Sequence, residues 1–315
     1  MAEVAREPHS VSLKVLRLSR PSLAQHFPLA VSPEGLDCST NPKAGVDIRD
    51  ENPDHHFILG RMLTLPPTFG AAFVGETFSC TLCANNELPP DAERQVSSIK
   101  VGAEMRCPSG TIALDVKPND DLSSQGQLKS GGSLQKIVQF DLREEGPHTL
   151  AVNVNYSEIT ISKDHSASGG RARSFSKLYQ FPARPCLNVR TKISPFPHED
   201  PLDIKQLALE AQLDNVGDGP VTLQAVTFAP KPAFKSTSLN WDAIKGIKDE
   251  GVDYPILSPR DVIQVAFLVE LNDNGPAREL TRDGRIVLGQ MSIQWRTAMG
   301  ETGFLSTGWL TTKRR

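Results

Sequence analysis

The 315-residue sequence lacks several features that mark common classes of protein. Its longest apolar runs, such as Val265–Val269, are far shorter than the roughly 18 residues that a membrane-spanning helix needs. The first residues, MAEVAREPHS, include no apolar segment of the kind found in secretory signal peptides. The five cysteines are odd in number and lack the spacing of a disulfide framework, which is typical of a reducing compartment. We therefore expect a cytoplasmic protein without a membrane span.

Strong charge and helical periodicity are also scarce. The net charge of −3 and the pI near 6.2 give no electrostatic reason to expect nucleic acid as a partner. No block of basic residues suggests a membrane surface. Residues 240–247, NWDAIKGI, offer a single short helical candidate. The scarcity of helical periodicity favours a fold built from strands.

Apolar and polar residues alternate with a period of two along nearly the whole chain. This spacing places the apolar residues on one face of a strand and the polar residues on the other. Prolines and glycines separate the alternating segments, as in turns between short strands. The segments span residues 78–84, 99–107, 112–116, 138–142, 150–156, 187–193, 207–213, 221–225, 263–271, 287–295 and 305–309. The pattern predicts an all-β fold.

Two tandem immunoglobulin-like β-sandwich domains would accommodate these strands. Two prolines in QFPARPCL (Gln180–Leu187) mark the boundary, with one sandwich over residues 1–183 and a second over residues 184–315. An acidic corner, a glycine and an alternating strand in Glu144–Tyr156 have a counterpart in Leu257–Leu271, which favours two similar domains. Polar inserts rich in Gly, Ser or Asp are expected to be mobile loops of the first sandwich: Asp37–His56, Lys117–Ser133 and Ser162–Ser174.

FGAAFVGETFSC, residues 69–80, has the glycine spacing of a phosphate-binding P-loop. Glu76, however, stands where that motif has the lysine that neutralises phosphate charge. A carboxylate about 4 Å from a phosphate charge would be repelled by about 4 kcal/mol at an effective dielectric near 20. The residues after Glu76 alternate as a strand, whereas a P-loop needs a helix N-terminus. We predict no direct nucleotide binding, with Gly70 and Gly75 bending the chain and Glu76 facing water at the start of the strand.

Cys80 and Cys83 form a C-x-x-C in the same predicted strand. Residues three apart on a strand point to opposite faces and lie about 10 Å apart, whereas a disulfide needs Cα atoms within about 7 Å. A zinc site would need a second pair of ligands, and the other cysteines, Cys38, Cys107 and Cys186, occur singly. We therefore expect Cys80 in the core and Cys83 on the opposite face.

The remaining polar clusters do not form a catalytic pattern. Acidic and histidine pairs fall in predicted loops or corners, three arginines fall between two strands, and a glycine-rich segment predicts a hairpin-type turn with no helix after it. These clusters are Asp120–Asp121, Glu144–Glu145, His55–His56, Arg278 with Arg282 and Arg285, and Gly217–Pro220. We predict no catalytic, cofactor-binding or metal-binding residues, no cofactor, and no enzymatic activity.

LTLPPTFGAAFVGETFSCTLCANNE (Leu63–Glu87) resembles the signature of the trafficking protein particle (TRAPP) complex subunit thirteen family. HSVSLKVLRLSRPSL (His9–Leu23), EEGPHTLAVNVNY (Glu144–Tyr156) and LGQMSIQWRTAMGETGFLSTGWL (Leu288–Leu310) match the family too, so the resemblance covers nearly the whole chain. The last segment reads as a strand, a Gly-Glu turn and a return strand, with Trp295 and Trp309 on its two strands and Trp295 in the core. Its match is carried by Trp295, Arg296, Thr297, Gly300, Glu301, Gly303 and Leu305.

The resemblance implies a non-catalytic subunit of a vesicle-tethering complex. TRAPP complexes act as guanine-nucleotide exchange factors for Rab GTPases in ER-to-Golgi traffic, Golgi traffic and autophagy. The implied partners are other TRAPP subunits, chiefly the large scaffold subunits. The implied location is cytoplasmic, with membrane association at the Golgi or ER–Golgi boundary only through the complex. Strand alternation is equally typical of a free-standing adaptor of the arrestin or coat-appendage type, and that alternative stays open.

Overall fold

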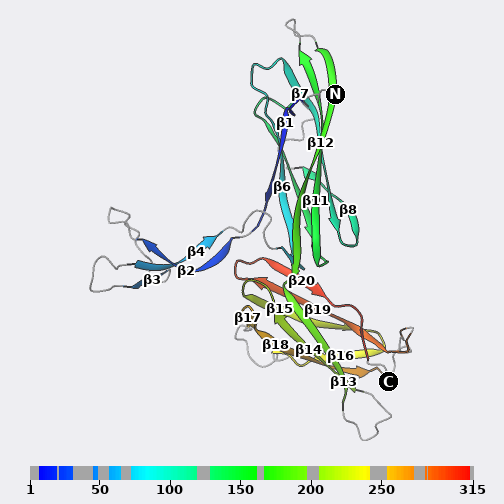
Figure 1. Ribbon diagram of the computed structural model, residues 1–315. Helices are drawn as coiled ribbons and strands as arrows, with labels where there is room; N and C mark the ends of the chain where they lie inside the picture. Colours follow the sequence, from blue (N-terminus) through cyan, green and yellow to red (C-terminus); the bar gives the residue numbers. More distant parts are fainter. Residues whose placement is uncertain are drawn as a thin grey trace, which may run out of the picture.

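The computed structural model describes residues 7–19, 21–30, 45–48, 57–64, 72–118, 128–161, 167–196, 206–241, 254–272, 281 and 283–312. All the regular elements in these ranges are β-strands (Figure 1). The prediction of an all-β fold is therefore confirmed. Within the same ranges, no helix is long and apolar enough to cross a membrane.

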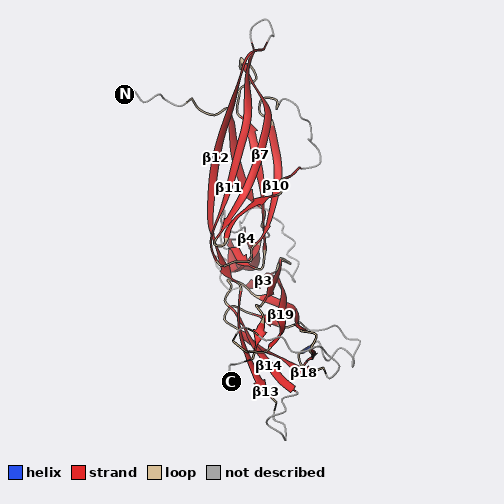
Figure 2. Ribbon diagram, turned by 90° about the vertical axis from the view of Figure 1, so that its right-hand side faces the viewer, coloured by secondary structure: helices blue, strands red, loops and turns tan. Residues whose placement is uncertain are grey.

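Two sheets enclose a hydrophobic cluster that we call the first core, and their long strands run side by side (Figure 2). The four-stranded sheet has the order β1 (Val11–Arg17), β6 (Thr77–Asn86), β10 (Ser133–Asp141) and β9 (Lys117–Pro118). The five-stranded sheet has the order β5 (Ala72–Val74), β12 (Ala167–Pro185), β11 (Gly146–Ile161), β7 (Arg94–Cys107) and β8 (Gly110–Leu114). The alternation in these segments is what buries one face of each sheet.

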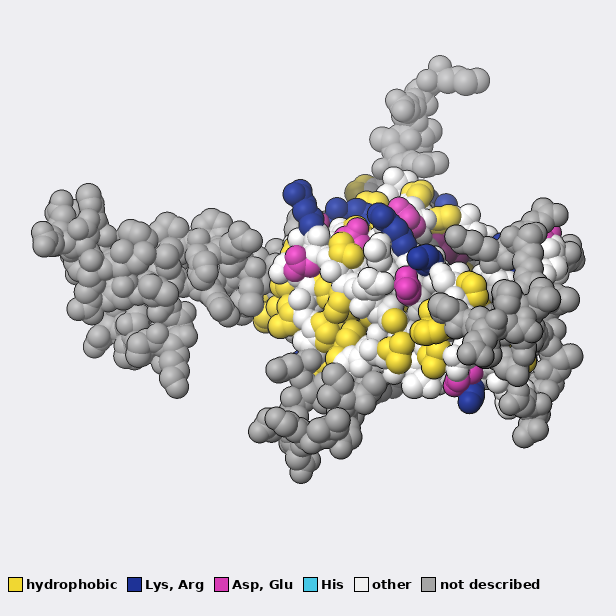
Figure 3. Space-filling model, turned by 90° about the horizontal axis from the view of Figure 1, so that it is seen from below, with side chains coloured by type: hydrophobic (Ala, Val, Ile, Leu, Met, Phe, Trp, Pro, Cys, Tyr) yellow, Lys and Arg dark blue, Asp and Glu magenta, His cyan; other side chains and the backbone are white. Residues whose placement is uncertain are grey.

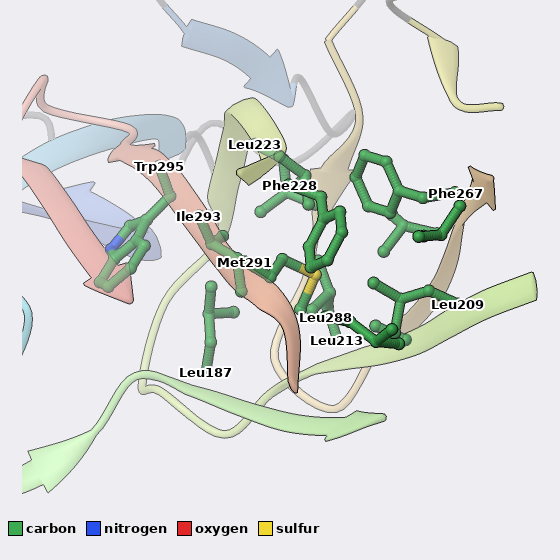
Figure 4. Close-up of a cluster of buried hydrophobic side chains, with 14 of the residues drawn as sticks. Leu187, Leu209, Leu213, Leu223, Phe228, Phe267, Leu288, Met291, Ile293 and Trp295 are labelled. Atoms are coloured by element: carbon green, nitrogen blue, oxygen red, sulfur yellow. The ribbon is translucent and has the colours of Figure 1, made fainter. Parts of the chain in front are cut away.

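Two further sheets enclose the second core (Figure 4). One has the order β13 (Leu187–Pro195), β14 (Gln206–Asn215), β18 (Val262–Leu271) and β16 (Phe234–Ser238). The other has the order β17 (Ile256–Leu257), β15 (Val221–Pro230), β19 (Val287–Thr297) and β20 (Thr302–Ser306), and β21 (Leu310–Thr311) also pairs with β19. Viewed from below, this end of the molecule shows apolar side chains beside a row of Lys and Arg side chains (Figure 3).

A fifth sheet, with three strands, lies to one side of both cores (Figure 1). Its order is β2 (Ser22–Ala30), β4 (Phe57–Thr64) and β3 (Gly45–Ile48). The prediction that Asp37–His56 is entirely loop is therefore wrong over β3, because these four residues pair with β4. The rest of that insert, with His55 and His56, lies outside the described residues.

The other two predicted inserts also contribute strand pairing. Most of Ser162–Ser174 belongs to β12, which pairs with β11 along its length, so that prediction is wrong from Ala167 onward. The insert Lys117–Ser133 begins with β9 and includes Leu128, which bridges to Val96. Residues 119–127 and 162–166 lie outside the described residues, as do 242–247 of the short helical candidate.

The chain passes from one core to the other within Gln180–Leu187. Phe181 and Ala183 belong to the first core, and Cys186 and Leu187 belong to the second. Division into two immunoglobulin-like domains at residue 183 stays a prediction. Gly217–Pro220 was predicted to be a hairpin turn, but it joins β14 and β15, which lie in different sheets. That prediction is wrong, because the turn carries the chain across the second core.

Candidate functional site: the joint between the two cores

Residues 72–76, where the chain bends before β6, lie against the terminal β19–β20 hairpin. We call this region, where the two cores meet, the joint. β5 begins the joint: Ala72 is buried in the first core and Val74 packs against it, while Phe73, between them, packs against the second core. Neighbouring residues of a strand point to opposite faces, so this short strand can contact both cores. Its pairing with the end of β12 is parallel, with Phe73 opposite Arg184.

Gly75 forms the corner after β5. Its φ of +96° is a conformation that L side chains rarely adopt. Its N–H donates to the Leu142 carbonyl at 2.7 Å, and the Glu76 N–H donates to the Phe73 carbonyl at 3.1 Å. The amides of Gly75 and Glu76 thus donate to carbonyls of the chain itself, and a strand follows them as predicted. The absence of nucleotide binding stays a prediction.

Trp295 of β19 fills the joint from the other side. Its side chain is fully buried, as predicted for a core residue, and lies at one end of the second core (Figure 4). A Cβ at position 75 would lie 2.5 Å from Trp295 Cη2, and one at position 303 would lie 2.2 Å from Trp295 Cε2. The Phe304 N–H donates to the Gly75 carbonyl at 2.9 Å. Gly75 and Gly303 are therefore needed for close approach, which explains two glycines in separate motifs.

Glu76 was predicted to face water, and this prediction is wrong. The residue is only 6% exposed. Burial raises the pKa of its carboxyl from 4.5 to about 7, and the nearby Glu301 carboxylate adds to the shift, while Arg17 opposes it. Burial likewise lowers the pKa of the Arg17 guanidinium, against the pull of Glu301 and Glu76. The joint therefore holds two acids and one base from three distant segments.

Polar contacts stabilise the part of the joint where Arg184 meets the turn between β14 and β15. Arg184 lies over the Phe73 ring, 5.4 Å from its centroid, and its Nη2 is 2.5 Å from Asp218 Oδ2. Asn215, fully buried, organises the turn that contains Asp218. Its Nδ2 donates to the carbonyls of Gly219 and Leu257, both at 2.9 Å, and its Oδ1 accepts from the Gly217 N–H. Sequence reasoning missed Asn215; its place at a strand end before Gly217 was the available signal.

The opposite end of the first core holds the segment that begins with His9. Ser10 Oγ donates to Glu158 Oε1 at 2.7 Å, and Arg173 Nη1 lies 3.0 Å from the same oxygen. The Tyr156 hydroxyl lies 3.0 Å from His9 Nδ1. Burial alone would raise the pKa of Glu158, but the bonds from Ser10 and Arg173 outweigh it and hold that pKa below its ordinary value. This cluster anchors the start of β1.

The remaining sequence candidates that lie within the described residues do not meet at one place. Cys80 is buried in the first core and Cys83 lies on the other side of β6, both as free thiols, as predicted. Glu144 is half-buried and accepts the Ser109 N–H at 2.9 Å. Arg285 pairs with Asp283. Asp120, Asp121, Arg278 and Arg282 lie outside the described residues. Across the described ranges, no three His, Cys, Asp or Glu side chains could together hold a metal ion.

Trp309 does not lie on the return strand of the terminal hairpin. β20 ends at Ser306, and Trp309 is 54% exposed in the segment that leads to β21. The Lys231 ammonium lies 3.9 Å from the centroid of its ring. The prediction for Trp309 is therefore wrong, because Gly303, rather than a second tryptophan, packs against Trp295.

Comparison with known proteins matches the chain in two consecutive parts. The model for the N-terminal part of trafficking protein particle complex subunit 13 matches residues 9–183, and the model for the middle domain of that subunit matches residues 187–314. The mouse protein of that name is 26% identical over 311 residues, covering 97% of this chain and 70% of the mouse protein. The zebrafish protein is 26% identical, with 97% and 69% covered. A probable Drosophila melanogaster homologue is 26% identical, with 98% and 66% covered.

Solved structures give a weaker likeness. A Porphyromonas gingivalis protein of unknown function is 14% identical, with 75% of this chain and 92% of that protein covered, at a TM-score of 0.20. A score this low carries no argument about fold or function. The two family models, in contrast, span the first core, the joint and the second core in order. The chain belongs to the trafficking protein particle complex subunit 13 family.

Proposed function

We propose that this protein is a non-catalytic subunit of a TRAPP vesicle-tethering complex. The observation that carries the proposal is the match of consecutive family models over residues 9–183 and 187–314. The joint agrees with a structural role, because the motif residues Gly75, Trp295 and Gly303 pack the two cores together. We take the two cores to be tandem immunoglobulin-like sandwiches that offer strand edges and loops to partners.

We also propose the partners of the protein and its location in the cell. The chief partners are the large scaffold subunits, and the exchange reaction on Rab GTPases is carried out by other subunits of the complex. The protein acts in ER-to-Golgi traffic, Golgi traffic and autophagy. It is cytoplasmic and reaches Golgi or ER–Golgi membranes only through the complex. It needs no cofactor and binds no nucleotide directly.

Purification of the tagged chain from its native cells tests this proposal. We expect a fixed set of TRAPP subunits to co-purify with the chain, and we expect the isolated chain to release no nucleotide from Rab GTPases. A joint variant, Gly303→Val, should lose the partners together with folded protein, whereas Trp309→Ala should keep both. If no TRAPP subunit co-purifies with the wild-type chain, the proposal fails and a free-standing adaptor takes its place.

A further inference from the structure

We propose that the open edge of β10, beside β8, binds an extended basic segment of another protein by strand addition. This proposal goes beyond the proposed function and does not depend on it, because it concerns the purified chain and a peptide only. The site is a hollow of about 800 Å³ at one side of the first core, lined by residues from both sheets. β10 and β8 form its walls, and Cys107 and His148 also line it.

The backbone of β10 is unpaired on the side that faces the hollow. β6 pairs with β10 along its whole length, but β9 reaches only Lys136 and Ile137 on the other side. No other described strand pairs with residues 138–141 there. The Leu142 N–H donates to the Glu76 carbonyl, so alternate residues bond toward β6. It follows that Gln139 and Asp141 direct their N–H and C=O groups to the open edge.

The second wall and the floor of the hollow are apolar. β8 is the last strand of its sheet and pairs only with β7 among the described strands. On one face of β8, Ile112 is 48% exposed and Leu114 is half-buried. Phe140, also half-buried, lies 6.4 Å from the His148 ring, centroid to centroid. A strand laid along β10 would therefore cover apolar side chains with every second residue.

His148 has a buried ring nitrogen that lacks a hydrogen-bond partner among the described residues. The residue is only 1% exposed and lines the hollow. Its Nδ1 lies 3.1 Å from the Gly146 carbonyl, which can only accept, so Nδ1 carries a proton. Nε2 is buried and has no hydrogen-bond partner within the described residues. Because an unsatisfied buried polar atom is unfavourable, a polar group of an incoming segment that bonds to Nε2 would stabilise this site.

The charges around the hollow select a basic occupant. Among the described residues that line it, three carry carboxylates, Asp115, Asp141 and Glu144, and one carries a guanidinium, Arg143. Asp141 and Arg143 form an ion pair at 3.7 Å. The amide and hydroxyl of Ser109 donate to Glu144, which lowers the pKa of Glu144 and keeps it ionised. An extended segment in which Lys or Arg alternates with apolar residues complements both the charge and the apolar floor.

The experiment titrates the full chain into a labelled short peptide in which valine alternates with lysine, with fluorescence anisotropy as the readout. We expect saturable binding that weakens as salt rises. The matched peptide in which valine alternates with glutamate should not bind. Gln139→Pro removes the open-edge donor and keeps the bonds to β6, so it should weaken binding about tenfold, whereas Gln139→Ala keeps the donor and should change it less than about twofold.

A thermal melt of each variant checks that it is folded. Ile112→Lys, an exposed substitution that opposes a basic peptide, gives a second measure and should also weaken binding. The proposal is overturned if folded Gln139→Pro and Ile112→Lys bind the lysine peptide as tightly as wild type, or if the glutamate peptide binds equally well. It is also overturned if the wild-type chain forms dimers that Gln139→Pro abolishes, since the edge would then belong to a second copy.

Discussion

The two ends of the first core each bury a glutamate, and their surroundings move the two pKa values in opposite directions. At the joint, burial and the Glu301 charge raise the pKa of Glu76 to about 7. At the other end, Ser10 and Arg173 donate to Glu158 and keep its pKa below the ordinary value despite burial. Both residues are less than a tenth exposed. Burial alone therefore does not decide the charge of a carboxyl in this protein.

The difference follows from the groups that surround each carboxyl in the folded protein in place of water. Glu158 Oε1 lies 3.0 Å from Arg173 Nη1 and accepts a hydrogen bond from Ser10 Oγ at 2.7 Å, so the charged form of Glu158 is stabilised in the folded state. Glu76 has a second acid nearby, and Arg17 also interacts with that acid, so its neutral form is favoured. The cluster at the start of β1 stabilises the charged form of Glu158, whereas ionisation of Glu76 at the joint lowers the stability of the folded state.

The largest change at the joint end should come from Trp295→Ala. Truncating a buried Trp costs about 3–5 kcal/mol of unfolding free energy, because contacts are lost and a cavity remains. Here the cavity would lie beside Gly75 and Gly303, so we expect the two cores to lose their fixed contact. A thermal melt beside the pull-down measures both effects. A variant that melts like wild type but loses its partners would make Trp295 an interface residue and contradict its core role.

Glu158→Gln should destabilise the far end at neutral pH. Removing one partner of a buried ion pair costs about 3–5 kcal/mol, because the other charge is left uncompensated, here that of Arg173. Since the folded pKa of Glu158 lies below 4.5, its stabilisation is present above about pH 4.5 and is lost as pH falls through the folded pKa. Denaturant titrations at neutral and acid pH should show the difference from wild type shrinking in acid. A constant difference would refute the charged state of Glu158.

Glu76→Gln should act with the opposite sign. The folded state holds a proton on Glu76 up to about pH 7, against 4.5 in the unfolded chain. Stability is therefore lost as pH rises from about 4.5 to about 7 and stays lower above that range, by at most about 3 kcal/mol. Glu76→Gln removes this loss, so it should be more stable than wild type at about pH 8 and equal to it at about pH 4. A destabilised variant at high pH would show that the Arg17 interaction outweighs burial.

Trp309→Ala should have the smallest effect, and it is the matched control for Trp295. Its ring is half-exposed and contacts the Lys231 ammonium, a surface interaction. We expect a change in unfolding free energy within about 0.5 kcal/mol. A drop comparable to that of Trp295→Ala would show that the half-exposed Trp309 ring also supports the fold.

Local patterns predicted the parts of the fold that depend on neighbouring residues. Phe78, Cys80 and Leu82 face the first core because residues two apart share a strand face, whatever covers that face. The mismatch of Glu76 with a P-loop was likewise readable, since the strand that follows it is a local feature. The inserts were less predictable: the Gly- and Ser-rich start of β12 is held as strand by its long pairing with β11.

Alternation predicted many of the strands, among them β6, β11, β14 and β18, but it missed the strand residues within the three inserts. The family motifs are also readable in the sequence, and the two prolines of Gln180–Leu187 predict a domain boundary in the segment where the chain passes from one core to the other. The burial of Glu76, the exposure of Trp309 and the open edge of β10 beside β8 could not be predicted from the sequence. Each depends on contacts that local alternation does not specify. The turn that contains Glu301 lies near Glu76, and Gly303 rather than Trp309 packs against Trp295. β9 pairs with only two residues of β10, Lys136 and Ile137. A period of two specifies which way a side chain points, but not what lies in front of it.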